Sequence, residues 1–498
     1  MSVVSFDWLV LAPALAPISG ALLVLVLDIL ASRASGLHLP VGLVALGAGI
    51  GALPFGAFDS VTGRTLCLPA GPDGACFYEG TAWGATLQLI ALGASLLVLL
   101  LLGPGTGHIS RAQRGGPAVT VALVLTATAG AVVVPAVRDL PSWLIAIELA
   151  TLPAVALVAL SRSPGAQRGA TALLMTSLTS FGLLAVGLAL WVLATGDARF
   201  APDTVAAAWA DADHHRALVM AVLFLLAGLG FKLSAVPFHT WTPQAFVPAD
   251  EAVAALLATT SKVAALGAVV VVVRPFVAPA MDGEDGRGTI IVILAVIALA
   301  SMTLGNLVAL TADDPVRLLA WSTIAQGGWV LLPMAVLGEG GIAAAVTYLL
   351  VYAAATLTVF AVAAAAHSGT EGAGERSLAA YRGMGRRQPL LAGALGLGLL
   401  TLAGLPPGIA GLFAKIVALR PIVGAGYWLV VAVAVVNVVI GLAVYLRWLL
   451  VLVSGGPPPE TPRQRLDPGL LAALVLATVV LVVASVVPGL ILGLAGLA

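Results

Sequence analysis

The three lysines of this chain are the residues whose type and placement point most directly to chemistry. The sequence of 498 residues has 23 lysines and arginines, and only Lys232, Lys262 and Lys415 are lysine. All three lie inside long apolar stretches, whereas every basic residue of the polar connections is arginine. A charge at the bilayer centre costs at least ~2.5–3.5 kcal/mol. A buried lysine can release its proton, while arginine stays charged. Codon bias explains the arginines of the connections but not these lysines, which indicate proton exchange within a membrane.

One acidic residue is placed in the same way. Most Asp and Glu residues lie in connections or at segment ends, but Glu148 lies inside the apolar stretch WLIAIELATLPAV. A carboxylate within a membrane segment needs a cationic partner, and a lysine is the natural candidate. The alternative is a carboxylate satisfied by backbone or water, with no part in transport.

Proline interrupts two of the apolar segments that carry these lysines. The stretch GFKLSAVPFH contains Lys232 and Pro237, and AGLPPG, with Pro406 and Pro407, precedes Lys415. Proline removes a backbone hydrogen bond and breaks or kinks a helix. Irregular backbone at membrane depth is tolerated only where it is buried in protein or lines a wet cavity. Two breaks five segments apart predict an internal repeat with a site between its halves; the alternative is two simple kinks.

The composition places these residues in a membrane protein. Hydrophobic residues make up 60% of the chain and charged residues only 9%, against about 25% charged in an ordinary soluble domain. Many apolar stretches are long enough to cross a bilayer as a helix. We predict an all-α polytopic membrane protein with about fourteen transmembrane helices and no strands. Its predicted parts are 1–116 (helices one to three), 117–275 (helices four to eight, the first repeat), 289–453 (helices nine to thirteen, the second repeat) and 468–498 (helix fourteen).

The distribution of arginine predicts the orientation, because cytoplasmic loops are enriched in Lys and Arg. One set of alternate connections carries thirteen arginines and the other set seven. The richer set is predicted to face the cytoplasm, so both termini are predicted to lie outside. The net charge of zero gives no reason to expect a nucleic-acid partner.

The two cysteines, Cys67 and Cys76, lie in one short connection, LCLPAGPDGAC. Two cysteines alone cannot build a zinc site. On the predicted outer, oxidising side they can form a disulfide, and two free thiols are the alternative, because spacing does not fix geometry. The sequence has no nucleotide-binding loop, haem motif or metal cluster, so we expect this chain to bind no metal.

Seven motifs together resemble the subunit N family of bacterial NADH-quinone oxidoreductase, respiratory complex I. They run in order and spacing over about residues 117–453. The motifs are GFKLSAVPFHTWTP (230–243), LATTSKVAALG (257–267), SMTLGNLVAL (301–310), VRLLAWSTI (316–324), YRGMGRRQPLLA (381–392), LAGLPPGIAGLFAK (402–415) and YLR (445–447).

The resemblance implies fourteen helices with two inverted five-helix repeats, in a multi-pass subunit of the bacterial cell membrane. Such a subunit translocates protons while quinone reduction drives it from a distance. Its partners would be the lipid bilayer and the other membrane-arm subunits, including the sister antiporter-like subunits. NADH, flavin, iron–sulfur clusters and the quinone would be bound by other subunits. The chain would then belong to an enzyme without holding a redox centre or cofactor itself.

The motifs also imply roles for single residues. Glu148 and Lys232 would be the interacting pair, Lys262 the central relay and Lys415 the ionisable residue of the second broken helix. The pair would keep Lys232 protonated, and loosening the pair would send the proton to Lys262 and on toward Lys415. His239 would either feed the entry of this path or pack and bind water.

Some positions depart from the family pattern and leave other functions open. The histidine common on the tenth segment is Gln326 here, which cannot exchange a proton but can hydrogen-bond water, and PADEA (248–252) replaces Gly-Ala-Pro-Thr-Pro. These departures give some support to an assembly paralogue that no longer pumps, and the three retained lysines count against that alternative. The same lysines would also serve a subunit of a multi-subunit cation/proton antiporter or of a proton-pumping membrane hydrogenase.

Overall fold

The computed structural model describes residues 6–30, 35–56, 63–68, 75–103, 116–277, 284–367, 376–454 and 466–494. Within these ranges, 12 helices are long and apolar enough to cross a membrane. Two shorter apolar helices, His38–Pro54 and Pro389–Ala403, lie beside them. The predicted all-α membrane class is therefore confirmed, while the number fourteen and the inverted repeat stay predictions. Arg33, Arg111, Arg114, Arg463 and Arg465, which contribute to the predicted orientation, lie outside the described residues.

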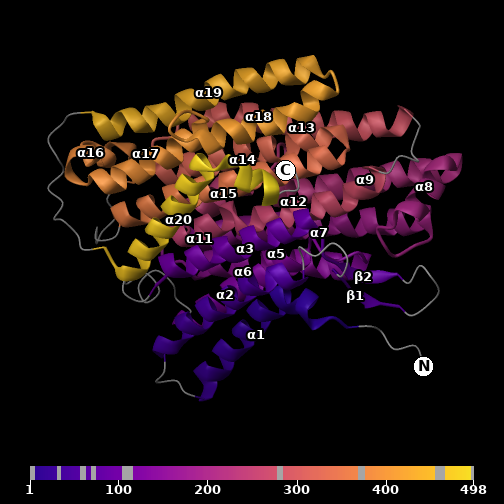
Figure 1. Cartoon of the computed structure of the whole chain (residues 1–498), viewed down its shortest axis with the longest axis horizontal. Coiled ribbons are helices and arrows are strands. Elements are labelled where there is room, and N and C mark those ends of the chain that lie inside the picture. The colour runs from indigo at the N-terminus through magenta and orange to yellow at the C-terminus, as the bar shows by residue number, and fades with distance from the viewer. Residues whose placement is uncertain are drawn as a thin grey trace.

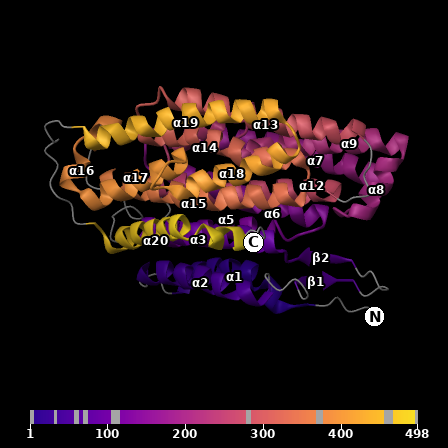
Figure 2. The same ribbon diagram turned by 45° about the horizontal axis from the view of Figure 1, so that its top comes forward.

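The N-terminal helices form a layer of their own at one edge of the bundle (Figures 1 and 2). Helices α1 (Trp8–Leu30) and α2 (His38–Gly56) pack on each other and on α5 (Gly116–Val133). Helix α3 (Ala82–Leu101) lies further in and contacts α15 (Glu339–His367). This layer covers one side of the helices that carry the lysines.

The segment of residues 140–277, which carries Lys232 and Lys262, contains two broken helices. Its elements are α6 (Leu140–Leu160), α7 (Ala166–Thr195), α8 (Pro202–Ala210), α9 (Ala212–Leu233), α10 (Trp241–Phe246), α11 (Glu251–Ala258), α12 (Thr260–Val273) and η3 (Arg274–Val277). The break between α9 and α10 contains Pro237, as predicted. The break between α11 and α12, at Thr259, was not predicted, because neither proline nor glycine stands there.

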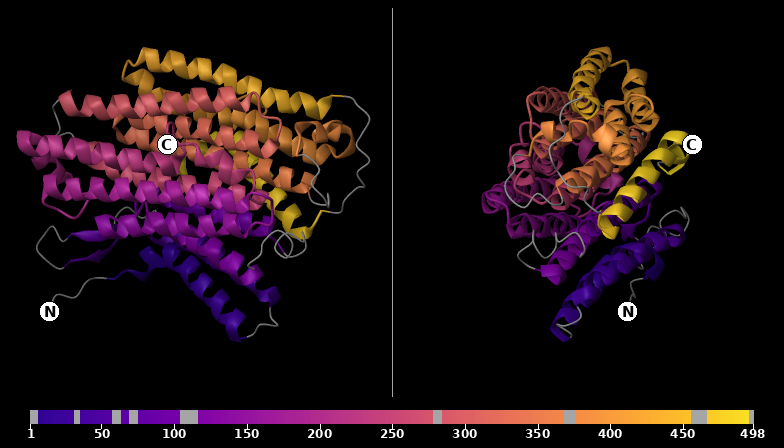
Figure 3. Two further views of the ribbon diagram at one scale, coloured as in Figure 1. Left: turned by 180° about the vertical axis from the view of Figure 1, so that it is seen from behind. Right: turned by 90° about the vertical axis from the view of Figure 1, so that its left-hand side faces the viewer.

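The second part contains the other predicted break. Its elements are α13 (Glu284–Ala309), α14 (Pro315–Leu331), η4 (Leu332–Val336), α15, η5 (Leu378–Tyr381), α16 (Met384–Arg387), α17 (Pro389–Ala403), α18 (Ile409–Gly424), α19 (Trp428–Val453), α20 (Pro468–Val486) and α21 (Pro488–Leu494). Pro406 and Pro407 lie between α17 and α18. Helix α20 runs across the side of the bundle and contacts α3, α15 and α18 (Figure 3).

The helices differ strongly in how much of their surface the protein covers. In the span that joins α11 and α12, 94% of the apolar window is buried, and in α15 the share is 89%. In α19 it is only 28%. Helices α11, α12, α14 and α15 therefore form the centre of the bundle, and α19 presents many of its apolar side chains outward.

A two-stranded hairpin lies at one end of the bundle, and α16 lies at the other (Figure 1). Strand β1 (Arg64–Cys67) pairs antiparallel with β2 (Cys76–Glu79). The prediction of no strands was therefore wrong. The strand sequences RTLC and CFYE do not alternate polar and apolar residues, so they lacked the pattern that indicates a strand. A disulfide between Cys67 and Cys76 joins the strands at directly opposite positions.

Candidate functional site

Lys232 and Glu148 form an ion pair inside the bundle. The distance from Lys232 Nζ to Glu148 Oε1 is 2.9 Å, and Lys232 is 9% exposed. Lys232 Nζ also donates to Ser177 Oγ at 2.8 Å and to Thr151 Oγ1 at 3.1 Å. Ser177 in turn donates to Glu148 Oε2 at 3.3 Å. Both hydroxyl groups therefore solvate a charge that would otherwise be costly to bury.

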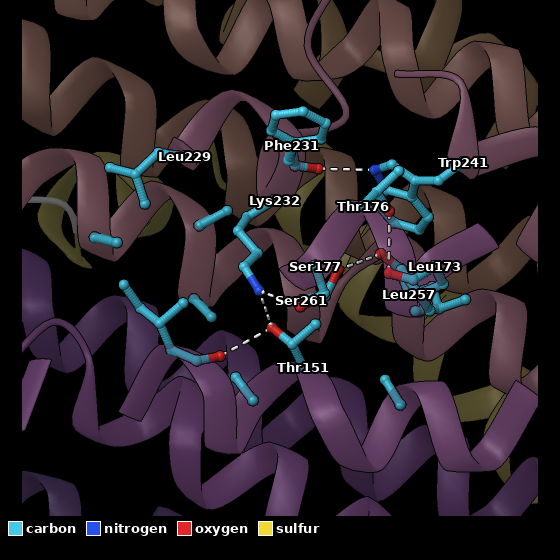
Figure 4. A pocket seen from close by; sticks show the side chains of 16 residues that line it. Thr151, Leu173, Thr176, Ser177, Leu229, Phe231, Lys232, Trp241, Leu257 and Ser261 are labelled. Atoms are coloured by element: carbon cyan, nitrogen blue, oxygen red, sulfur yellow. Dashed lines mark hydrogen bonds between the residues drawn. The ribbon is translucent and has the colours of Figure 1, made fainter. Parts of the chain in front are cut away.

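Lys232 lies in the last turn of α9, and the end of that helix fixes its position. Ser234 adopts the left-handed conformation with φ of 60°, which ends the helix. The Trp241 indole Nε1 donates to the carbonyl oxygen of Phe231 at 2.8 Å (Figure 4), which also accepts from the backbone N–H of Ser234 at 3.2 Å. Phe238 packs against Gly230 so closely that a Cβ there would lie 2.5 Å from its ring. The break is thus a packed structure that holds the lysine in place.

Lys262 lies three residues after the break at Thr259 and is bound to the end of α9. Its Nζ donates to Ser234 Oγ at 2.5 Å and to the carbonyl oxygen of Lys232 at 3.3 Å. The side chain is 2% exposed and lies 5.2 Å from the ring centroid of Trp241. The carbonyl end of a helix carries a partial negative charge, which stabilises a cation.

Lys415 lies in the second turn of α18, and its side chain reaches back to the second predicted break. Its Nζ donates to the carbonyl oxygens of Leu402 at 3.0 Å and Ala403 at 2.5 Å, the last residues of α17. It is 5% exposed and lies 5.7 Å from the ring centroid of Trp329. Lys262 and Lys415 therefore bind the same kind of group, the free carbonyls at the end of a broken helix.

Gln326 lies in a hydrogen-bonded group of tyrosines. Its Nε2 donates to the Tyr445 hydroxyl at 2.8 Å, and the Tyr348 hydroxyl donates to its Oε1 at 2.5 Å. His239 lies apart from this group, with its ring centroid 5.5 Å from that of Trp321. The structure therefore brings Gln326, but not His239, among buried polar groups of the second part.

Two small cavities border these residues. One of about 30 Å³ is lined by Lys232, Ser177, Thr151 and Ser261 among others (Figure 4). A cavity needs roughly 10–15 Å³ to hold one water, so this one has room for about two. A smaller cavity, of about 10 Å³, lies between Gln326 and the end of α17. Both have polar groups in their walls, as a bound water requires.

Two wider grooves open at the surface near the same residues. A groove of about 870 Å³ is lined by Arg168, Arg317, Asp314, Gln244 and Trp321 among others. Another, of about 610 Å³, has almost wholly apolar walls on α6 and contains Glu148. The ion pair thus borders a small cavity toward α12 on its Lys232 side and an apolar groove on the outer face of α6 on its Glu148 side.

A buried charge cluster that the sequence analysis did not single out lies at the end of the bundle with α16. Glu251, at the start of α11, is 3% exposed. Its Oε1 lies 3.2 Å from His367 Nδ1 and 3.1 Å from Arg376 Nη2. The two partners are more than a hundred residues away in the chain, so spacing gave no signal for them. In the described part of the chain, no group of three or more His, Cys, Asp or Glu residues could hold a metal ion.

Comparison with known proteins places the chain in a family. Residues 138–441 match the family model described as NADH:quinone oxidoreductase/Mrp antiporter, TM. The chain belongs to this family. The resemblance that the seven motifs carry is confirmed, and the family segment contains all three lysines and Glu148.

Individual members of the family are similar over nearly the whole chain. The protein named NADH-quinone oxidoreductase subunit N 2 from Streptomyces griseus is 36% identical over 477 residues, which cover 92% of this chain and 85% of that protein. A chain of respiratory complex I from Thermus thermophilus, solved with bound aureothin, has a TM-score of 0.76 at 26% identity, covering 97% of this chain and 98% of that chain. A chain of the Mrp complex from Dietzia has a TM-score of 0.81 at 22% identity, covering 99% and 97%, which shows a shared fold.

Proposed function

We propose that this chain is the proton-translocating subunit N of a bacterial NADH-quinone oxidoreductase. The observation that carries the proposal is the series Glu148, Lys232, Lys262 and Lys415. All three lysines are buried, each lies next to a helix break or reaches one with its side chain, and each is bound to an acidic or carbonyl oxygen. The relatives that are similar over most of the chain are named subunit N of that enzyme.

The proposed mechanism is a relay of one proton along this series. Glu148 holds the ammonium form of Lys232, because an opposite charge favours the charged state. When the pair separates, the proton leaves Lys232 through water in the 30 Å³ cavity and converts neutral Lys262 into its ammonium form. Lys262 then passes a proton toward Lys415. The end of α9 couples the first two steps, because Lys262 binds the carbonyl of Lys232 and the hydroxyl of Ser234.

The direction of this transport follows from the proposed orientation in the bacterial plasma membrane. The end of the bundle with α16 carries Arg382, Arg386 and Arg387, and we assign it to the cytoplasm. Both termini and the disulfide hairpin then face outward. The groove of about 870 Å³ would admit water from the cytoplasm as far as Trp321, against which His239 packs. His239 would bind water at this entry.

Neighbouring subunits complete the proposed machine. The apolar groove on α6 leaves the side chain of Glu148 16% exposed at membrane depth. A carboxylate there needs cover from protein or water, and we place another membrane-arm subunit on this face. NADH, flavin, iron–sulfur clusters and the quinone would bind to other subunits, so this chain would take part in the enzyme without a redox centre.

Purification of the intact assembly tests the proposal. A tagged chain is extracted from native membranes in mild detergent, and the co-purifying subunits and NADH:quinone reductase activity are measured. We expect flavin, iron–sulfur clusters and NADH oxidation in the purified complex. Co-purification with only antiporter subunits, together with cation/proton exchange and no NADH oxidation, would contradict the proposal in favour of an antiporter. A co-purifying nickel enzyme would indicate the hydrogenase. A complex that fails to assemble without this chain, but pumps normally when its three lysines are replaced, would indicate an assembly role.

A further inference from the structure

A proton that moves from Lys262 to Lys415 must pass a region whose central polar side chain cannot titrate. Gln326 lies there on α14, and an amide neither gains nor loses a proton near neutral pH. The tyrosines whose hydroxyl groups lie around it are Tyr348 and Tyr352 on α15 and Tyr445 on α19. This inference rests on the proposed function and asks which of these groups carries the proton.

Tyr352 lies at the break that precedes Lys262. Its hydroxyl donates to the carbonyl oxygen of Ala258 at 3.0 Å and to Thr323 Oγ1 at 3.2 Å. In a continuous helix, the Ala258 carbonyl would accept from the N–H of Lys262. That N–H bonds the Thr259 carbonyl at 2.9 Å. The break thus exposes a carbonyl, and the tyrosine hydroxyl occupies it.

Tyr348 lies one turn from Tyr352 on the same face of α15. Its hydroxyl donates to Gln326 Oε1 at 2.5 Å. Both tyrosines line the cavity of about 10 Å³, whose opposite wall includes Thr401 and Leu402. The carbonyl of Leu402 is a ligand of Lys415 Nζ. The cavity is large enough for about one water, so a single water there would connect α15 with the end of α17.

Tyr445 differs from these two residues. Its hydroxyl accepts from Gln326 Nε2 and bonds Ser322 Oγ at 2.7 Å. It does not line the cavity that leads to Lys415. Tyr445 therefore holds the amide of Gln326 in one orientation, with its Oε1 toward Tyr348.

We propose that Tyr352 and Tyr348, with a water in the α15–α17 cavity, carry the proton from Lys262 to Lys415 and so pass around Gln326. The ammonium group of Lys262 loses one proton and becomes neutral. The oxygen of a tyrosine accepts that proton while its own O–H bond breaks and releases a proton to the water. The water passes a proton to neutral Lys415, which becomes an ammonium group. Each tyrosine ends neutral, and rotation of its hydroxyl resets the path.

Proton uptake by inverted membrane vesicles, per NADH oxidised, tests the proposal. The double variant Tyr348→Phe/Tyr352→Phe is measured by itself and in combination with Gln326→His. Lys262→Met is the reference. Tyr381→Phe is the matched control, since it removes a buried hydroxyl near α16. Phe keeps each ring in place, and complex assembly is compared by the amount of complex extracted. We expect the double variant to lose as much proton uptake as Lys262→Met, and Tyr381→Phe to lose none.

Gln326→His separates a proton path from a packing effect. A histidine at this position can exchange protons, so it should restore proton uptake to the tyrosine double variant. The restored uptake should depend on pH around the ordinary histidine pKa of about 6.5, unlike that of the wild type. Suppose that Lys262→Met abolishes proton uptake. The tyrosine path would then be overturned if the double variant takes up protons like the wild type, or if it loses proton uptake and Gln326→His does not restore it. Unchanged uptake in Lys262→Met would instead refute the proposed function.

Discussion

The side chain of Lys262 donates a hydrogen bond to the backbone carbonyl of Lys232, with 3.3 Å between Nζ and O. Two lysines from different segments are thereby joined through the end of α9. A movement of that helix end that separates Lys232 from Glu148 also changes the environment of Lys262. The broken helix is therefore the element on which both ionisable groups depend.

The hydrogen bonds of Ser177 to the ion pair predict that Ser177→Ala weakens the pair. Ser177 bonds both Lys232 Nζ and Glu148 Oε2. A hydrogen bond to a charged group contributes about 1.5–3 kcal/mol, so we expect slower proton uptake in inverted vesicles and a lower melting temperature of the complex. Thr179→Val is the control, because its hydroxyl bonds its own helix at an exposed position. Equal behaviour of the two variants would show that Ser177 does not support the pair.

The second break predicts a packing effect of Gly411→Ala. A Cβ at Gly411 would lie 1.7 Å from the carbonyl oxygen of Thr401. The backbones of α17 and α18 must then separate, which we expect to cost about 1–3 kcal/mol and to displace Lys415 from its carbonyl ligands. Gly393→Ala on α17, with nothing within 4 Å of its Cβ, should be neutral. Thermal unfolding of the purified complex measures both, and a stable Gly411→Ala complex would contradict this packing.

The proposed orientation predicts which side of the membrane exposes the hairpin. Cys67 and Cys76 are the chain's two cysteines and form a disulfide. After reduction, a membrane-impermeant maleimide should label them in right-side-out vesicles and leave them unlabelled in inverted vesicles. Labelling only in inverted vesicles would reverse the orientation of the whole chain. Cys67→Ser/Cys76→Ser gives the background.

Glu79 predicts that acid loosens the hairpin. Burial acts to raise the pKa of this carboxyl, but Arg138, which donates to it at 3.0 Å, and the nearby Arg274 and Arg64 lower it below the ordinary value of 4.5. A carboxyl with a lowered pKa stabilises the fold above its unfolded value, and this stability disappears as the pH falls through the folded value. Reduction of the disulfide by a phosphine should therefore accelerate as the pH falls below about 4.5. Glu79→Gln should be reduced fast at every pH, and an equal pH dependence in both would contradict this role.

The sequence was most informative where single residues are costly in a membrane. The isolated lysines and Glu148 stood out from their apolar neighbours, and Pro237 and Pro406 marked two breaks. A charge is unfavourable in any membrane segment, and a proline removes a helical hydrogen bond in any tertiary context. The break at Thr259 could not be predicted from the sequence, because the residues around Thr259 are compatible with a helix. Only packing in three dimensions interrupts the helix there. The cluster of Glu251 was also missed, because its partners meet only in three dimensions.

The pairing of Lys232 with Glu148 is the central claim, and Lys232→Met tests it most directly. The measurement is proton uptake per NADH oxidised in inverted vesicles, at matched amounts of assembled complex. Methionine keeps most of the length of the side chain and removes its proton and charge. The account predicts a clear loss of proton uptake with the complex intact. Unchanged uptake and unchanged quinone reductase activity would contradict it, and the chain would then be a scaffold whose lysines serve another purpose.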